Sequence, residues 1–315
     1  MRRRHNGIKR GARLANDASE AVLDRGPVEF KSRISSRPGD VMTIASREVI
    51  KIPPTMTIMG AIKTMMTYGL RKVPVADPGT NRLVGIITSV DLIDFLGGGE
   101  RHNLVKKRYG GNLLAAINGD VREIMEVDVI TLSDRQSLED ALNTMLIQNI
   151  GGLPIVDDRH RVVGIISESD FAYLIADVKT GKIVGDYMSR RVVTTPPDIS
   201  IGEAAKTMVS NGFRRLPVIR DDVLLGIVTA TDIVKYLGGG KAFDKLVTGH
   251  IQEALEPAIK TIMVPNVVTT TSDVDLGDAA KLMMDKKVGS LPVIDDGFLM
   301  GILTERDILR ALRET

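Results

Sequence analysis

The chain has 315 residues, of which 43% are hydrophobic and 26% charged, a balance typical of a folded globular protein. It contains no cysteine, which excludes disulfides, thiolate metal sites and cysteine nucleophiles. No apolar run approaches the roughly 18 residues of a membrane helix, and the charged start Met1-Arg2-Arg3-Arg4 is unlike a signal peptide, so we expect a cytoplasmic protein.

The formal net charge of +2 is unevenly distributed. Residues 1–38 carry ten Lys or Arg against four Asp or Glu, so this stretch has a charge of +6 and the remainder −4. We expect a solvated arm; the alternative is nucleic-acid binding, because Lys and Arg neutralise phosphates. The basic residues concerned are Arg2, Arg3, Arg4, Lys9, Arg10 and Arg13. No nucleic-acid-binding motif accompanies them, and aromatic residues for base stacking make up only 3% of the chain.

Beyond the arm, one pattern of residues occurs four times. Each copy begins with a short β-branched run and continues with apolar residues at the period of an amphipathic helix. An apolar-Pro-apolar step follows, then Gly, two aliphatic residues, Thr or Ser, two variable residues and Asp. Ile58, Leu138, Ile201 and Leu276 start the helical spacing, each sixteen residues before Pro74, Pro154, Pro217 or Pro292. Each copy therefore predicts strand, helix, strand, turn, strand, helix.

Glycine runs group the repeats into pairs. Gly97-Gly98-Gly99 follows repeat 1 and Gly238-Gly239-Gly240 follows repeat 3, and we interpret both as helix C-caps and hinges. Each run opens a connecting stretch, 100–119 or 241–256, whose spacing predicts helices, whereas the short join at 177–185 predicts a boundary. We expect an arm at 1–38, a first pair at 39–178 with repeats at 39–99 and 120–178, and a second pair at 179–315 with repeats at 183–240 and 257–315.

These motifs resemble four tandem cystathionine-β-synthase (CBS) domains, which are β-α-β-β-α modules, over roughly residues 40–315. The resemblance implies an α+β fold in which paired repeats form two pseudo-twofold modules with clefts for an adenosine ligand. It implies that the Asp holds the ribose hydroxyls and that the Thr or Ser approaches ribose or phosphate. These residues are Asp91, Asp170, Asp232 and Asp307, with Thr88, Ser167, Thr229 and Thr304. The alternative is that both residue types only cap the second helix.

The same resemblance makes two further sets of residues candidates for the cleft. The first-strand set is Lys51, Thr131, Thr194 and Thr269. The phosphate set is Arg71, Lys72, Arg214 and Arg215, just before the apolar-Pro step, with Arg306 in repeat 4. Repeats 2 and 4 have Gly151-Gly152 and Gly289-Ser290 at that step. The alternative for the basic pairs is that they complement the dipole at a helix C-terminus.

The sequence contains no phosphate loop, no dinucleotide-binding glycine motif and no nucleophile beside a base. Its four histidines lack metal-ligand spacing. We therefore expect a non-enzymatic protein without a catalytic cofactor. The resemblance implies a regulatory protein that binds AMP, ADP or ATP, signals to a protein partner in trans and forms a homodimer. The alternatives are a module that binds S-adenosylmethionine and the nucleic-acid binder described above.

Overall fold

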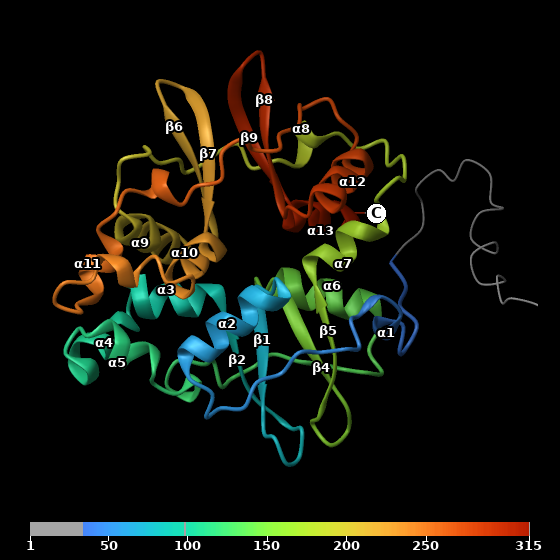
Figure 1. Cartoon of the computed structure of the whole chain (residues 1–315). Helices are drawn as coiled ribbons and strands as arrows, with labels where there is room; N and C mark the ends of the chain where they lie inside the picture. Colours follow the sequence, from blue (N-terminus) through green and yellow to red (C-terminus); the bar gives the residue numbers. More distant parts are fainter. Residues whose placement is uncertain (1–33, 98, 315) are drawn as a thin grey trace, which may run out of the picture.

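The computed structural model describes residues 34–97 and 99–314. The arginines and lysines at positions 2–13 lie outside them. Each repeat contains an antiparallel hairpin whose first strand carries the proline of the apolar-Pro step. The hairpins are β1 (Lys72–Ala76) with β2 (Leu83–Thr88), β4 (Gly152–Val156) with β5 (Val162–Ser167), β6 (Arg215–Arg220) with β7 (Val223–Thr229), and β8 (Ser290–Asp295) with β9 (Phe298–Thr304). The first two hairpins and the last two lie at opposite ends of the molecule, with the helices between them (Figure 1).

Two helices complete each repeat. The first helices are α2 (Ile58–Tyr68), α6 (Leu138–Ile147), α9 (Ile201–Asn211) and α12 (Leu276–Lys286). Thr57, Ser137, Ser200 and Asp275 cap their N-termini by accepting a backbone N–H. The second helices, which follow the hairpins, are α3 (Ser89–Gly97), α7 (Glu168–Leu174), α10 (Ala230–Gly238) and α13 (Glu305–Arg313). The helical spacing predicted from the sequence is thus confirmed in all four repeats.

The predicted first strand is shorter than expected. In repeat 2 it is β3 (Leu132–Ser133), which pairs parallel to β4. In the other repeats it is a single parallel bridge, made by Ile52, Thr195 and Thr270. Each repeat opens instead with one helical turn: α1 (Val41–Ile44), η2 (Val121–Glu123), α8 (Val184–Tyr187) or η4 (Ile259–Thr261).

The first connecting stretch forms helices, as predicted, and the second does so only in part. The first forms α4 (His102–Tyr109) and α5 (Leu113–Ile117), whereas the second forms a single turn, η3 (Phe243–Lys245), and the short α11 (Ile251–Leu255). No helix among the described residues is both long enough and apolar enough to span a membrane.

Backbone pairing links repeat 1 to repeat 2 and repeat 3 to repeat 4. Ile86 pairs with Glu126 in the first half, and Ile227 pairs with Val264 in the second. The buried apolar side chains are grouped differently. One core joins the helices of repeats 1 and 3, and a second core joins those of repeats 2 and 4. The two halves of the chain therefore share their cores.

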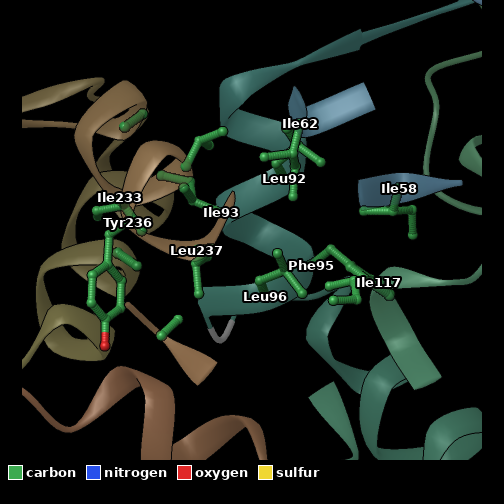
Figure 2. Packing of buried hydrophobic residues seen from close by; sticks show 14 of the residues in the cluster. Ile58, Ile62, Leu92, Ile93, Phe95, Leu96, Ile117, Ile233, Tyr236 and Leu237 are labelled. Atoms are coloured by element: carbon green, nitrogen blue, oxygen red, sulfur yellow. The ribbon is translucent and has the colours of Figure 1, made fainter. Parts of the chain in front are cut away.

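The first core is centred on α3 and α10. Ile93 and Leu96 of α3 lie beside Ile233 and Leu237 of α10, and all four side chains are buried (Figure 2). Gly97 and Gly238 end these helices, and they face α9 and α2 of the other repeat. A Cβ atom on Gly97 would lie 2.4 Å from the Cβ of Ala205, and one on Gly238 would lie 2.4 Å from Ile62 Cγ2. These two glycines allow close packing at the ends of α3 and α10, and Gly239 is the C-cap of α10, as predicted. The hinge role of the glycine runs stays a prediction.

The body of the protein begins before the expected end of the arm. Ile34 packs against the second core. The carbonyl of Ser35 accepts a hydrogen bond of 3.1 Å from the backbone N–H of Glu139, at the start of α6. Residues 34–38 therefore contact the folded part rather than belonging to a separate arm.

Candidate functional site

The Thr-x-x-Asp corner is a reciprocal cap of the second helix. In repeat 4, the backbone N–H and the hydroxyl of Thr304 donate to Asp307 Oδ2 at 2.8 and 2.7 Å. The same two bonds join Thr88 to Asp91, Ser167 to Asp170, and Thr229 to Asp232. The helix cap is therefore present in all four repeats, but it uses only one carboxylate oxygen of each Asp.

The other carboxylate oxygen, Oδ1, has a different environment in each repeat. Among the described residues, no side chain hydrogen-bonds to Oδ1 of Asp170 or Asp232. Arg310 lies 3.0 Å from Oδ1 of Asp307, and Arg101 forms an ion pair with Oδ1 of Asp91. Burial raises the pKa of Asp307, whose side chain is 2% exposed, although Thr304 lowers it. An Oδ1 without a protein partner can accept a hydroxyl donor from a ligand.

Asp307 and Thr304 line a cavity of 380 Å³ in the second half of the chain. The extended segment at the start of repeat 3 supplies an apolar wall through Val192 and Val193. Arg214 and Arg215 line the same cavity. One cavity thus combines the Thr-x-x-Asp corner and an apolar wall with several guanidinium groups, since Arg191, Arg306 and Arg310 line it as well.

Asp232 and Thr229 line a second cavity, of 510 Å³, built in the same way. Here the apolar wall is Val267 and Val268, from the start of repeat 4. Arg214 and Arg215 also line this cavity, so the two cavities share both arginines.

The first-strand candidates do not join these cavities. Thr194 and Thr269 are exposed and lie outside both linings, which contain instead the valines just before them. Thr195 and Thr270 form the bridges to the hairpins and are buried. Lys51 and Thr131 are half-buried in the first half and line neither cavity. The short β-branched runs located the segment correctly but not its inward-facing residues.

The basic pairs meet at the junction of all four repeats, with two glutamates. Arg71 of repeat 1 donates two hydrogen bonds, of 3.0 and 3.2 Å, to Glu305 of repeat 4. Glu168 of repeat 2 lies 3.4 Å from Arg214 of repeat 3 and accepts a bond of 2.6 Å from Nε of Arg306. We call this group the central charged cluster; it comprises Arg71, Lys72, Arg214, Arg215, Arg306, Glu168 and Glu305.

The glycines of repeats 2 and 4 make room for this cluster. A Cβ on Gly151 would lie 2.6 Å from Arg214 Nη1, and one on Gly289 would lie 2.8 Å from Arg71 Nη1. Lys72 Nζ donates to the carbonyl of Gly151. The absence of basic residues at this step in repeats 2 and 4 is therefore explained by packing, because the basic side chains of repeats 3 and 1 arrive there.

The central charged cluster has five cationic side chains and two carboxylates. Desolvation, with repulsion from Arg214, lowers the pKa of Lys72 to about 7. Desolvation also lowers the pKa of Arg215 to about 10. Burial alone would raise the pKa of Glu168, but Arg214 and Arg306 lower it. The cluster is thus short of negative charge, and an anion brought into it would be stabilised.

Glu168 and Glu305 were not among the residues singled out from the sequence. Both follow the Thr or Ser of the repeat motif, where repeats 1 and 3 have Ser89 and Ala230. Repeats with the basic pair thus have a small residue here, and repeats with glycine have Glu. This alternation was a detectable signal for ion pairs between repeats. Among the described residues, no group of acidic and histidine side chains is arranged to hold a metal ion.

Known proteins show the same organisation. The model of the CBS domain matches residues 39–98, 121–177, 184–239 and 259–314. Protein MJ1225 of Methanocaldococcus jannaschii is 40% identical over 273 residues, which cover 86% of this chain and 98% of that protein. Its crystal structure, described as that of a candidate archaeal homolog of g-AMPK, superposes with a TM-score of 0.82 at 39% identity and covers 86% of this chain and 99% of that one. The 33.4 kDa protein in the ribosomal RNA operon of Thermofilum pendens is 32% identical over 261 residues, 83% of this chain and 87% of that protein. This chain is a member of the CBS-domain family, with four CBS domains in an α+β fold.

Proposed function

We propose that the protein is a non-enzymatic regulator that binds an adenosine nucleotide, AMP, ADP or ATP, in the clefts of its second pair of repeats. The observation that supports this most is the construction of the two cavities. Each joins a Thr-x-x-Asp corner to a valine wall and to the shared Arg214 and Arg215.

Each part of such a nucleotide has a matching group. Oδ1 of Asp232 accepts from the ribose hydroxyls, while Oδ2 stays in the helix cap. Val267 and Val268 offer an apolar surface to the adenine. Arg214 and Arg215 bind phosphate oxygens, for which a guanidinium provides paired donors.

The charge of the cluster favours a phosphorylated ligand over S-adenosylmethionine. The sulfonium of S-adenosylmethionine is positive, and the central charged cluster already contains an excess of cations, so the two repel one another. Competition between AMP and S-adenosylmethionine at low salt distinguishes these ligands. The nucleic-acid alternative depends on residues 2–13, which lie outside the described part of the chain.

Regulation follows from the ion pairs between the two halves. A phosphate on Arg214 competes with Glu168, which belongs to the other half, so ligand binding shifts the equilibrium between arrangements of the halves. The altered surface would be recognised by a protein partner in trans, with the protein as a homodimer.

The test replaces the ribose acceptors. In Asp232→Asn and Asp307→Asn, the amide oxygen retains the helix cap but the amide nitrogen cannot accept from a hydroxyl. We expect each variant to weaken AMP binding at its own cleft by about 1.5–3 kcal/mol, the scale of a hydrogen bond to a charged group. Isothermal titration measures the affinity for AMP, and the melting temperature shows whether the helix cap is retained.

Asp140→Asn is the matched control, because Asp140 caps α6 through Ser137 by the same two bonds but lines neither cavity. AMP affinity equal to that of the wild type in both cleft variants would refute the ribose role.

A further inference from the structure

Arg101 lies across the Thr-x-x-Asp corner of repeat 1, where the repeat pattern predicts a cleft. It follows α3, where its backbone N–H donates to Asp94 Oδ1 at 3.1 Å. Its guanidinium forms an ion pair with Asp91 of repeat 1 and lies 3.5 Å from Glu126 of repeat 2. The Arg101 and Asp91 side chains are 26% and 17% exposed, so this contact is largely shielded from water.

The corresponding cleft of repeat 3 is open. Ile86 pairs with Glu126 in the first half as Ile227 pairs with Val264 in the second, and the latter two residues line the 510 Å³ cavity with Asp232. Counting from the glycine runs, Ala242 occupies the position of Arg101. Ala242 is fully buried and its methyl group has no donor to offer Asp232. The two clefts thus have the same backbone frame but differ in this cationic side chain and in the residue at the backbone bridge, which is Glu126 in the first half and Val264 in the second.

A guanidinium and a ribose can both offer a carboxylate two adjacent hydrogen-bond donors. Two N–H donors lie side by side in the guanidinium, and two O–H donors lie side by side in a cis-diol. Oδ1 of Asp91 accepts from Arg101, and Oδ2 accepts from Thr88, so both oxygens have partners. A nucleotide could reach Asp91 only by displacing Arg101.

We infer that Arg101 acts as an internal substitute for the ribose and keeps the repeat-1 cleft empty of nucleotide while the repeat-3 cleft, where Oδ1 of Asp232 has no such partner among the described residues, is filled. In the repeat-4 cleft Arg310 also pairs with Oδ1 of Asp307, but the Arg310 side chain is 57% exposed against 26% for Arg101, so a ligand displaces it at lower cost. This inference rests on the proposed function. Displacing a partly shielded, charge-assisted contact of about 1.4 kcal/mol corresponds to a tenfold loss of affinity at the repeat-1 cleft. The repeat-1 cleft would therefore bind nucleotide more weakly than the similar repeat-3 cleft.

The experiment counts bound AMP by equilibrium dialysis over a concentration range that saturates the wild type. We expect Arg101→Ala to bind one additional AMP per chain, or to bind at this cleft at least about tenfold more tightly. Asp91→Asn combined with Arg101→Ala should return the count to that of the wild type. Arg122→Ala is the control, since Arg122 is an exposed arginine of the same half that pairs with Asp120. Melting temperatures confirm that all variants are folded.

The outcomes separate this inference from the proposed function. Wild-type binding of AMP with an unchanged count and affinity in Arg101→Ala overturns the role of Arg101 and leaves the proposed function standing. Binding by Arg101→Ala but not by the wild type supports the role of Arg101 and overturns occupancy of the second half. Failure of both proteins to bind AMP overturns both.

Discussion

At the scale of single residues, the burial of Lys72 in the central charged cluster has a cost in stability. Its amine is close to Arg71 and Arg214, and its pKa falls to about 7 because of desolvation and this repulsion. A lysine in the unfolded chain has a pKa of about 10.4. Between these values the unfolded state binds more protons than the folded state, so the free energy of unfolding rises with pH.

We therefore expect the wild type to become more stable from pH 7 to pH 9, and Lys72→Met to be less sensitive to pH over that window. Lys72→Met should also be more stable than the wild type at pH 7, because the methionine has no charge to desolvate. Urea denaturation at pH 7, 8 and 9 measures both effects. The same change at the exposed Lys63 is the control, and equal pH slopes in Lys72→Met and the wild type would contradict the explanation.

The shared arginines give a second prediction at this scale. Replacing Arg214 and Arg215 together by glycine, as repeat 2 has naturally, should weaken AMP binding several-fold or more and leave adenosine binding about as before, because only AMP carries the phosphate. The helix-dipole alternative predicts a small loss of stability, ~0.3–1 kcal/mol per charge, and no change in the ratio of the two affinities. Titration with both ligands at low and moderate salt distinguishes the two.

The sequence predicted the residues of the candidate site, but not the residues with which they form ion pairs. The Thr-x-x-Asp corner recurs at fixed spacing, so Asp232 and Asp307 could be singled out as a pair. The partners of the basic pairs come from other repeats: Glu305 is far from Arg71 in sequence. The residue pattern within one repeat cannot predict a contact with another repeat. The glycines at this step in repeats 2 and 4 show only that no basic residue is there, not that an arginine of another repeat fills the space.

At the scale of elements, glycines at the ends of α3 and α10 allow close packing against neighbouring helices. In Gly97→Ala the new Cβ would meet Ala205 of α9 at 2.4 Å, so α3 and α9 must move apart. We expect a loss of roughly 1–3 kcal/mol in the free energy of unfolding, as for other overpacked cores.

Two further variants make this prediction specific. Adding Ala205→Gly to Gly97→Ala transfers the methyl group to the other helix and should restore part of the loss. Gly79→Ala, at a turn where the nearest heavy atom lies 3.5 Å away, should change stability little. Thermal and urea unfolding compare the four proteins. Wild-type stability of Gly97→Ala would show that these helices tolerate separation.

Hairpins and helices were predictable at this scale because both have a residue period that the repeats reproduce. The first strand of each repeat was harder to predict. Val192 and Val193 favour extended backbone, but the parallel pairing to β6 amounts to one bridge at Thr195. With so little pairing, the alternation of inward and outward side chains could not be read from the β-branched run, and Thr194 was assigned to the cleft in place of its neighbours.

At the scale of the whole molecule, the two halves are bound together through both cores. The sequence indicated which repeats pair through their backbone but not which repeats share a core. Leu92, Ile93, Phe95 and Leu96 are all buried, so the apolar face of α3 is wide enough for more than one neighbour and its pattern does not select one of them. The bonds from Arg71 to Glu305 and from Arg214 to Glu168 cross the same boundary, which places the arginines of the central charged cluster where the halves meet.

This arrangement predicts how the halves behave when they are separated. A protein of residues 179–314 would expose side chains that the intact chain buries against the first half, including Ile201, Ala205, Ile233 and Leu276. Because repeats 1 and 2 resemble repeats 3 and 4, a second copy of residues 179–314 presents similar helices, so we expect a dimer that replaces the missing half. Light scattering after size-exclusion chromatography measures its mass. Adding residues 34–178 should convert the dimer into a one-to-one complex, in which Gly97 again meets Ala205. A monomer of residues 179–314 with the melting temperature of the intact chain would show that each half is stable alone, and the two shared cores would then contribute little to folding.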